Sequence, residues 1–306
     1  MTKPRFLLSV HNDDNDFQIE QVASARLAAA KAGADLDVVC AQDDGILQSQ
    51  QLLNRIQSVV DLRPHAILVE PAGSTVLPQV ARAAATAGIG WALLSRNADY
   101  LNELRTTYRV PAFVVTSDHE EIGRIQGRQL SALATAGGVV LYIQGPSQSH
   151  AATQRYVGLL ETKPENVQLR VLRAHWTESS SLKAVTSWLR LSTSRATEII
   201  AVCAQDDSMA VGARKAFEQC ALELNKSWLK IPFLGIDGLP KTGQAWVRSG
   251  LLAATVFSPP TAAIAIELMA RFMELGTMPP VRVVTEPKSI PAIEELARNA
   301  RAASSQ

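Results

Sequence analysis

The chain has 306 residues, of which 47% are hydrophobic and 19% charged, so it can bury substantial cores and lacks the composition of a disordered protein. Thirty basic residues against 29 acidic ones give a net charge of +1, and this balance argues against nucleic acid or an anionic membrane surface as a partner. No window approaches the roughly 18 consecutive apolar residues of a membrane-spanning helix, so we expect no membrane insertion.

Short apolar runs alternate along the chain with amphipathic segments, which predicts strands and helices in turn. We expect strands at 6–10, 36–40, 66–70, 91–95, 113–117, 139–145, 168–172, 199–204, 232–237 and 252–257. We expect helices at 17–32, 46–60, 75–87, 118–135, 150–161, 178–191, 206–221 and 260–275. Several of these helices begin at a residue suited to cap them, such as Ser74-Thr75, Asp118 or Asp206.

Most of the expected strands are continuously apolar rather than alternating, which is typical of strands buried on both faces of a parallel sheet. Their order predicts an α/β protein with two doubly wound parallel-sheet lobes of similar topology. No Pro/Gly-rich linker separates the halves, and the expected junctions lie near residues 115, 258 and 287. A chain that crosses at all three junctions would join the lobes by a three-segment hinge, with a ligand cleft between them.

Ligands of open parallel sheets bind outside the carboxyl ends of the strands, so the residues that follow each strand are the candidates for a site. The first strand leads into "HNDDNDF", which has more Asx residues than a turn requires and an aromatic behind them. Glu70 and Ser95 also follow strands. The candidates that supply amide, guanidinium, carboxylate, hydroxyl or aromatic groups are Asn15, Phe17, Arg96, Arg155, Trp176, Asp206, Asp237 and Ser258.

This set of side chains suits a molecule with vicinal hydroxyl groups. A carboxylate accepts from two adjacent hydroxyls, a guanidinium donates to two, and an aromatic face packs against the C–H side of a sugar ring. The sequence therefore predicts a sugar-sized slot in which Asn15 and Phe17 form one wall. Polar residues at strand ends also serve as caps, and Trp176 is equally compatible with a core position. We expect Asp118 to cap a helix, Asp207 to be a cap or hinge partner, and Asp13 and Asp14 to be solvated.

The chain resembles, from end to end, the type I periplasmic binding proteins of the ribose-binding kind, which are relatives of the ligand-binding core of the lac repressor. The resemblance rests on the order and spacing of "NDFQ", "LVEPAGST", "LLSRNAD", "SDHEEIGRIQGRQL", "LYIQGPSQSHAATQRYVGL", "AVCAQDDSMAVGARKAF", "FLGIDGLP" and "LAATVFSPP". Its most specific part is "CAQDDSMAVGA" with "GIDGLP" some 25 residues later.

The resemblance implies one lobe of residues 1–115 plus 259–287, a second of 116–258 plus 288–306, and closure of the hinge around the ligand. It also implies that the eight candidates named above contact a sugar. The chain departs from the family pattern in three places that leave the sugar's identity open. Asp206 stands where an amide is usual, Gln18 where a second aromatic is common, and Ser258 where a longer amide is common.

The resemblance further implies a non-enzymatic receptor for a monosaccharide or related polyol, serving as the substrate-binding component of an ABC sugar uptake system. The partner would be an ABC transporter permease or a sensor protein. The alternative is a cytosolic sugar-sensing receptor or regulator core without a DNA-binding domain, since only five residues precede Phe6. The compartment would be the periplasm if a leader was removed, and the cytoplasm if Met1 is the native start.

Other classes of protein lack their motifs in this sequence. A phosphorelay receiver would need a phospho-accepting Asp after the third strand, where Glu70-Pro71 stands. A nucleotide-dependent oxidoreductase would need a Gly-rich turn after the first strand, and a hydrolase of the GxSxG kind would need that motif. The histidines, none with zinc-ligand spacing, are His11, His65, His119, His150 and His175. We therefore expect no catalysis, no cofactor and no metal ion.

Overall fold

Residues 3–73, 76–195, 197–224 and 230–304 are described by a computed structural model of the chain. The chain folds as two units: Met1–Ser117 with Pro260–Thr285, and Asp118–Pro259 with Glu286–Gln306. It therefore passes from one unit to the other three times, after residues 117, 259 and 285. The junctions expected from the sequence, after 115, 258 and 287, differ from these by two, one and two residues.

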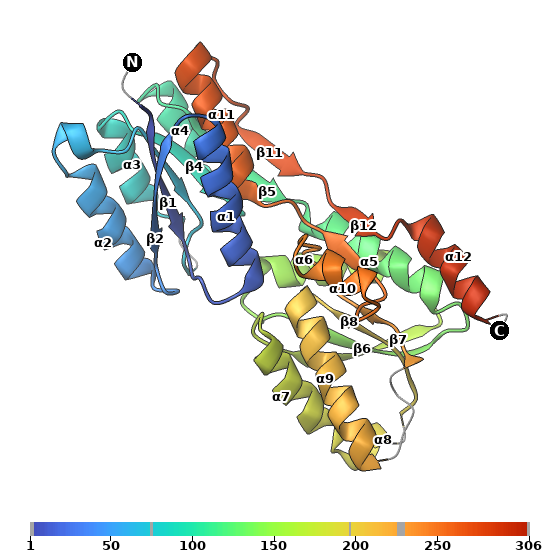
Figure 1. Ribbon diagram of the computed structural model, residues 1–306. Helices are drawn as coiled ribbons and strands as arrows, with labels where there is room; N and C mark the ends of the chain where they lie inside the picture. The colour runs from blue at the N-terminus through green and yellow to red at the C-terminus, as the bar shows by residue number, and fades with distance from the viewer. Residues whose placement is uncertain (1–2, 74–75, 196, 225–229, 305–306) are drawn as a thin grey trace. The chain divides into compact units, whose positions relative to one another are not determined.

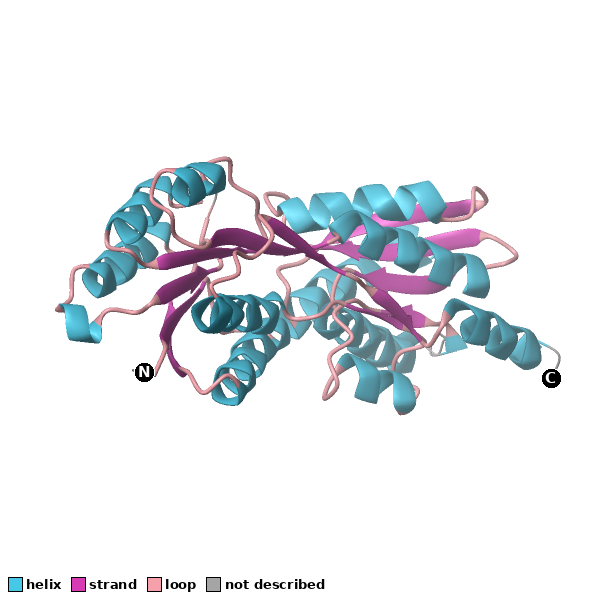
Figure 2. Ribbon diagram, turned by 90° about the horizontal axis from the view of Figure 1, so that it is seen from above, coloured by secondary structure: helices cyan, strands magenta, loops and turns pink. Residues whose placement is uncertain are grey.

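Unit 1 is a single parallel sheet with helices on both faces (Figures 1 and 2). Its elements in chain order are β1 (Arg5–Val10), α1 (Asp16–Lys31), β2 (Asp35–Cys40), α2 (Gly45–Ile56), the 3-10 turn η1 (Val60–Leu62), β3 (Ala66–Val69), α3 (Pro78–Thr86), β4 (Gly90–Leu94), α4 (Leu101–Thr106), β5 (Ala112–Ser117), α11 (Thr261–Leu275) and β11 (Arg282–Thr285). The strands lie in the order β11-β5-β4-β3-β1-β2, and every neighbouring pair is parallel.

Both faces of the unit 1 sheet are buried at its central strands β1, β3, β4 and β5, which explains their continuous apolar runs. Successive residues of a strand point to opposite faces, so Leu7 of β1 packs in one core while Phe6 and Leu8 pack in the other. Helices α2, α3 and α4 complete the core around Leu7, and α1 and α11 complete the second. The carboxyl ends of the parallel strands consequently share one edge, where the loops can present side chains.

Unit 2 has the same layered arrangement of helices on both faces of a parallel sheet (Figure 2). Its elements are α5 (His119–Leu133), β6 (Gly138–Gln144), α6 (His150–Thr162), β7 (Val167–Arg173), α7 (Glu178–Leu189), α8 (Ser192–Arg195), β8 (Ile199–Ala204), α9 (Asp207–Leu224), β9 (Phe233–Leu234), α10 (Gly243–Arg248), β10 (Thr255–Phe257), β12 (Lys288–Ile290) and α12 (Ile293–Ser304). The parallel strand order is β7-β6-β8-β9, and β10 pairs antiparallel with β12.

Helices α5 and α6 of unit 2 touch through glycines. A Cβ on Gly123 of α5 would lie 2.1 Å from the carbonyl oxygen of Arg155, and a Cβ on Gly158 of α6 would lie 1.9 Å from that of Glu120. Both distances are far below van der Waals contact, so only glycine allows the two backbones to come this close. This contact fixes the part of α6 that carries Arg155.

The α/β class with parallel sheets is confirmed, whereas several element boundaries were wrong. The helix expected at 46–60 ends at Ile56, the one expected at 75–87 begins at Pro78, and the strand expected at 252–257 keeps only its last three residues. The capping pair Ser74-Thr75 lies outside the described residues. The sequence missed α4, α8, α10, α12, β11 and β12, because these elements are short or half exposed and carry no long apolar pattern. Among the described residues, no helix has the length and apolar character to cross a membrane.

Candidate functional site

The loop after β1 is organised by side-chain hydrogen bonds that begin helix α1. Asn15 is the N-cap of α1, and its Oδ1 accepts from the backbone N–H of Gln18 at 3.0 Å. Its Nδ2 donates to Asn12 and Asp14 at 3.3 Å each. The run of Asx residues therefore caps a helix and also holds half-buried Phe17 in the first helical turn. Asp14 and its neighbour Asp13 are exposed, as expected.

Arg96 follows β4 at the same edge of the sheet and is half buried. Its Nη1 donates to the carbonyl of Gly73 at 2.5 Å. Ser95, the residue before it, has φ +67°, a left-handed backbone conformation that a side chain disfavours. Strained positions of this kind cluster at functional sites. Because β4, β3 and β1 are neighbours, Arg96 and Asn15 stand along one edge with the end of β3 between them, although no direct contact joins them in the described structure.

Between them lies Glu70, which follows β3 and is only 8% exposed. Its Oε1 accepts from the Ser95 hydroxyl at 3.3 Å and lies 3.9 Å from His11 Nε2. His11 Nδ1 in turn lies 2.7 Å from Asp43 Oδ1. The sequence analysis placed Glu70 at a strand end but did not include it among the ligand contacts. A carboxylate in an otherwise apolar segment at the end of a strand could have indicated a buried polar group there.

Arg155 organises the corresponding edge of unit 2. It projects from α6, is 7% exposed, and donates from Nη1 to the backbone carbonyl of Gln205 at 2.5 Å. Its Nη2 lies 3.8 Å from Asp237 Oδ1, and its guanidinium carbon lies 5.7 Å from the centre of the Trp176 ring. The structure thus brings together three of the predicted residues as a guanidinium, a carboxylate and an aromatic ring.

Trp176 occupies a core-lining position, and its contact with a ligand stays a prediction. Part of the side chain packs on the core formed by α7, α9 and the unit 2 sheet, while its ring faces Arg155. A Cβ on Gly145 would lie 2.2 Å from Trp176 Cη2, so the glycine leaves the space that the ring fills. Trp176 and Asp237 both have positive φ, +58° and +104°. Strain at two of the three residues of this cluster is again typical of a functional site.

The two aspartates after β8 differ in their roles. Asp206 is buried and its Oδ1 accepts from the backbone N–H of Met209, so it caps the start of α9 as expected. Asp207 accepts from the backbone N–H of Gly238 at 2.7 Å and from the Thr255 hydroxyl at 2.6 Å. Burial raises the pKa of Asp207 to about 8, despite these hydrogen bonds, which favour the ionised form. Asp207 ties α9 to β10, close to the hinge.

Ser258, the remaining predicted contact, is 1% exposed, and its backbone N–H donates to the carbonyl of Asp237 at 3.0 Å. This bond fixes the backbone at Asp237, which belongs to the Arg155 cluster. A direct contact between Ser258 and a ligand stays a prediction.

The sequence missed two residues of this edge. Gln205 is fully buried: its Nε2 donates to the Tyr142 hydroxyl at 2.7 Å and to a backbone carbonyl, and its Oε1 accepts from the backbone N–H of Gly145 at 2.9 Å. Gln205 therefore connects the loop at Gly145, on which the Trp176 ring packs, with Arg155, which donates to the Gln205 backbone carbonyl. His119, the first residue of α5, has its pKa lowered to about 3 by burial and by the charge of Arg155, so the ring is neutral at physiological pH.

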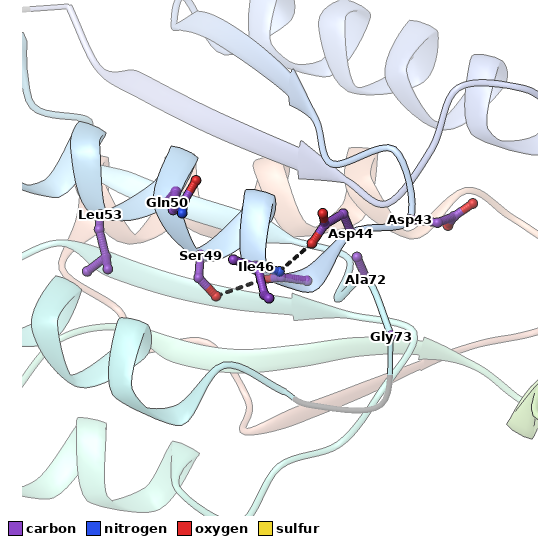
Figure 3. Close-up of a pocket in the computed structure, with 9 residues that line it drawn as sticks. Asp43, Asp44, Ile46, Ser49, Gln50, Leu53, Ala72 and Gly73 are labelled. Atoms are coloured by element: carbon purple, nitrogen blue, oxygen red, sulfur yellow. Dashed lines mark hydrogen bonds between the residues drawn. The ribbon is translucent and has the colours of Figure 1, made fainter.

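An open depression of about 620 Å³ lies in unit 1, at the start of α2 (Figure 3), and its lining includes Gly73, whose carbonyl accepts from Arg96. Its polar groups serve the helix: Asp44 Oδ1 accepts from the N–H of Ile46, and the Ser49 hydroxyl donates to the carbonyl of Gly45. None of the predicted ligand contacts lines it. Within the described ranges, no group of three His, Cys, Asp or Glu side chains is placed to hold a metal ion. The absence of a metal stays a prediction.

Comparison with known proteins identifies the family. The chain matches the family described as "Periplasmic binding protein domain" over residues 6–277, which is most of its length. The chain belongs to the type I periplasmic binding proteins. The resemblance inferred from the sequence motifs is thereby confirmed. One relative in this family is the ribose import binding protein of Escherichia coli (strain K12), 27% identical over 260 residues, which are 85% of this chain and 81% of the relative. Another is a putative rhizopine-binding protein of Rhizobium meliloti, 28% identical over 233 residues, or 74% of this chain and 69% of the relative.

Solved structures of periplasmic binding proteins share the fold. An ABC transporter periplasmic solute binding protein from Actinobacillus succinogenes 130z, with bound D-allose, matches with a TM-score of 0.78 and 24% identity over 97% of this chain and 100% of that one. The Caulobacter myo-inositol binding protein bound to myo-inositol matches with a TM-score of 0.76 and 19% identity over 96% and 95% of the two chains. At these identities the likeness establishes the fold class.

Proposed function

We propose that this periplasmic binding protein is a non-enzymatic receptor for a monosaccharide or a related polyol and serves as the substrate-binding component of an ABC importer. The family is one of periplasmic binding proteins, and the relatives include an import binding protein for ribose. These relatives favour uptake over a cytosolic sensing role. The proposal places the protein in the periplasm, with a permease as its partner.

The observation that carries the proposal is the cluster of Arg155, Trp176 and Asp237. Arg155 Nε is buried and has no hydrogen-bond partner among the described residues, and its Nη2 lies 3.8 Å from Asp237, longer than a hydrogen bond. The cluster therefore keeps a buried donor, Arg155 Nε, for a ligand to bond. A hydroxyl that lies beside both groups can accept from the guanidinium and donate to the carboxylate.

We further propose that each unit supplies half of the site. Unit 1 contributes Asn15, Phe17 and Arg96, and unit 2 contributes the Arg155 cluster with Asp206 and Ser258. Closure on the three-segment hinge would let both halves bind one ligand. A ligand favours the closed form only through contacts that it makes there and not in the open form.

The test is a calorimetric and thermal-shift panel of pentoses, hexoses, deoxy-sugars and inositols on protein that has been unfolded, dialysed and refolded to remove any bound ligand. A true ligand at 100 to 1,000 times its Kd stabilises the protein by roughly 3–4 kcal/mol. Arg155→Ala and Asp237→Ala should each weaken binding by about 2–5 kcal/mol, because each removes a buried charged group that is proposed to bond the ligand and leaves the ligand hydroxyl without that partner. Arg170→Ala, which removes an exposed arginine of β7, is the matched control and should bind normally.

Two results would count against the proposal. Binding of no member of the panel by the folded protein contradicts the function itself. Normal affinity in Arg155→Ala or Asp237→Ala contradicts the site at that position while leaving the function intact.

A further inference from the structure

Strand β11 is an edge strand of the unit 1 sheet. It pairs with β5 on one side, and in the part of the chain that the structure describes it has no second neighbour (Figure 1). Two of its residues, Arg282 and Val284, are exposed to solvent. An edge strand of this kind carries backbone N–H and C=O groups that can pair with another strand.

The register with β5 shows which backbone groups of β11 face outward. Val114 of β5 lies opposite Arg282, and its N–H donates to the carbonyl of Val281 at 2.9 Å. Because the backbone groups of successive residues point to alternate sides of a strand, the odd-numbered residues of β11 face β5. Arg282 and Val284 therefore turn their N–H and C=O groups away from the sheet. Glu286 precedes a proline and so favours an extended backbone, which continues this alternation.

The three outward-facing residues are complementary to a second copy of themselves. In an antiparallel pair centred on Val284, the two copies of Val284 lie opposite each other, and Arg282 of each copy lies opposite Glu286 of the other. Each opposing pair exchanges N–H and C=O groups that already face outward, so these are hydrogen-bonded pairs. The side chains of all three residues share one face of the strand, which places opposite charges directly across from each other.

The signs of the charges distinguish β11 from an edge that excludes a partner. Charged side chains protect many edge strands, because like charges directly opposite each other destabilise an antiparallel pair. Arg282 and Glu286 are both exposed and have opposite signs on the two sides of Val284, so in this register they attract. The segment that leads into the strand adds exposed apolar side chains, Leu275 and Met278 among them, that a partner can cover.

We propose that two copies of this chain associate through their β11 strands, paired antiparallel about Val284, with the ion pair between Arg282 and Glu286 formed twice. The proposal goes beyond the ligand site, since none of the residues assigned to the ligand lies on β11. The paired segment is limited to residues 282–286, so the dimer exchanges with the monomer and its fraction rises with protein concentration.

The experiment measures molecular mass by sedimentation equilibrium from about 1 µM to 1 mM, the range in which weak complexes dissociate. The unaltered chain should pass from monomer to dimer as its concentration rises. Glu286→Arg and Arg282→Glu each place like charges opposite each other, so each should weaken the dimer about tenfold or more. A mixture of these two variants restores opposite charges at both pairs and should dimerise with about the original affinity. Glu165→Arg, the same change at an exposed position of unit 2, should leave dimerisation unaltered.

A further variant, Val284→Pro, tests the backbone pairing. The N–H of Val284 faces away from β5, so proline keeps the bonds to β5 and removes the central pair of the dimer. Thermal unfolding shows whether each variant folds, and the charge variants decide the proposal if the proline variant does not. A chain that stays monomeric over the whole range overturns the proposal. Dimerisation that persists in the folded variants, or a mixture of the charge variants that stays monomeric, also overturns it.

Discussion

The close contact between α5 and α6 gives a sharp prediction, because one methyl group should affect both stability and binding. In Gly123→Ala the new Cβ would lie 2.1 Å from the carbonyl oxygen of Arg155, whereas ordinary contact begins at 3.4 Å. Helix α6 must therefore move by about 1.3 Å at this point, the difference between the two distances. Overpacking of this kind costs about 1–3 kcal/mol. The displaced residue is Arg155 itself, so its bond to the Gln205 carbonyl should also weaken.

The assay pairs urea unfolding, followed by tryptophan fluorescence, with calorimetric affinity for the ligand found in the panel. Gly123→Ala should lower the free energy of unfolding by about 1–3 kcal/mol and weaken binding about tenfold. The control is Gly250→Ala in the same unit, where the new Cβ meets nothing within 4 Å and only the φ of +74° opposes it. That change should cost about 1 kcal/mol and leave affinity unchanged. Equal unfolding free energies and unchanged affinity in both variants would refute the packing argument.

Two further predictions concern buried polar groups. The folded state keeps the Asp207 proton up to a pKa of about 8, whereas the unfolded chain releases it near 3.8, so the folded state binds more protons in that window and loses stability as pH rises. Asp207→Asn should remove this dependence on pH, which approaches about 1.4 kcal/mol per pH unit. The measurement is the free energy of unfolding in urea at pH 5 and at pH 8. An equal fall in this free energy between the two pH values in both proteins would contradict the prediction. Gln48 bonds the Ser9 hydroxyl, the Glu70 carbonyl and the Ala72 N–H, all at 2.8–2.9 Å. Gln48→Leu should therefore cost about 2–4 kcal/mol in urea unfolding, while the same change at exposed Gln50 should cost less than about 0.5 kcal/mol.

Much of the architecture follows from local patterns in the sequence. A strand buried on both faces must be apolar at nearly every position, so the central strands β1, β3, β4, β5, β6 and β8 are recognisable without knowledge of their neighbours. The helix starts at Asp118 and Asp206 were equally accessible, because an N-cap bonds to a backbone N–H only two or three residues further along. The short elements α4, α10 and β12 were not, since their 6, 6 and 3 residues carry too little apolar pattern to be recognised.

The chemistry of the site depends on partners that are distant in the chain. Glu70 meets Ser95 across 25 residues, Arg155 meets the Gln205 carbonyl across 50, and Gln205 meets Tyr142 across 63. The sequence by itself determined which polar residues follow the carboxyl ends of the strands and which family the chain resembles. Only the tertiary structure decided which of those groups are buried, which are already satisfied by hydrogen bonds, and which retain capacity for a ligand, because burial and pairing arise when the sheets bring separate loops to one edge.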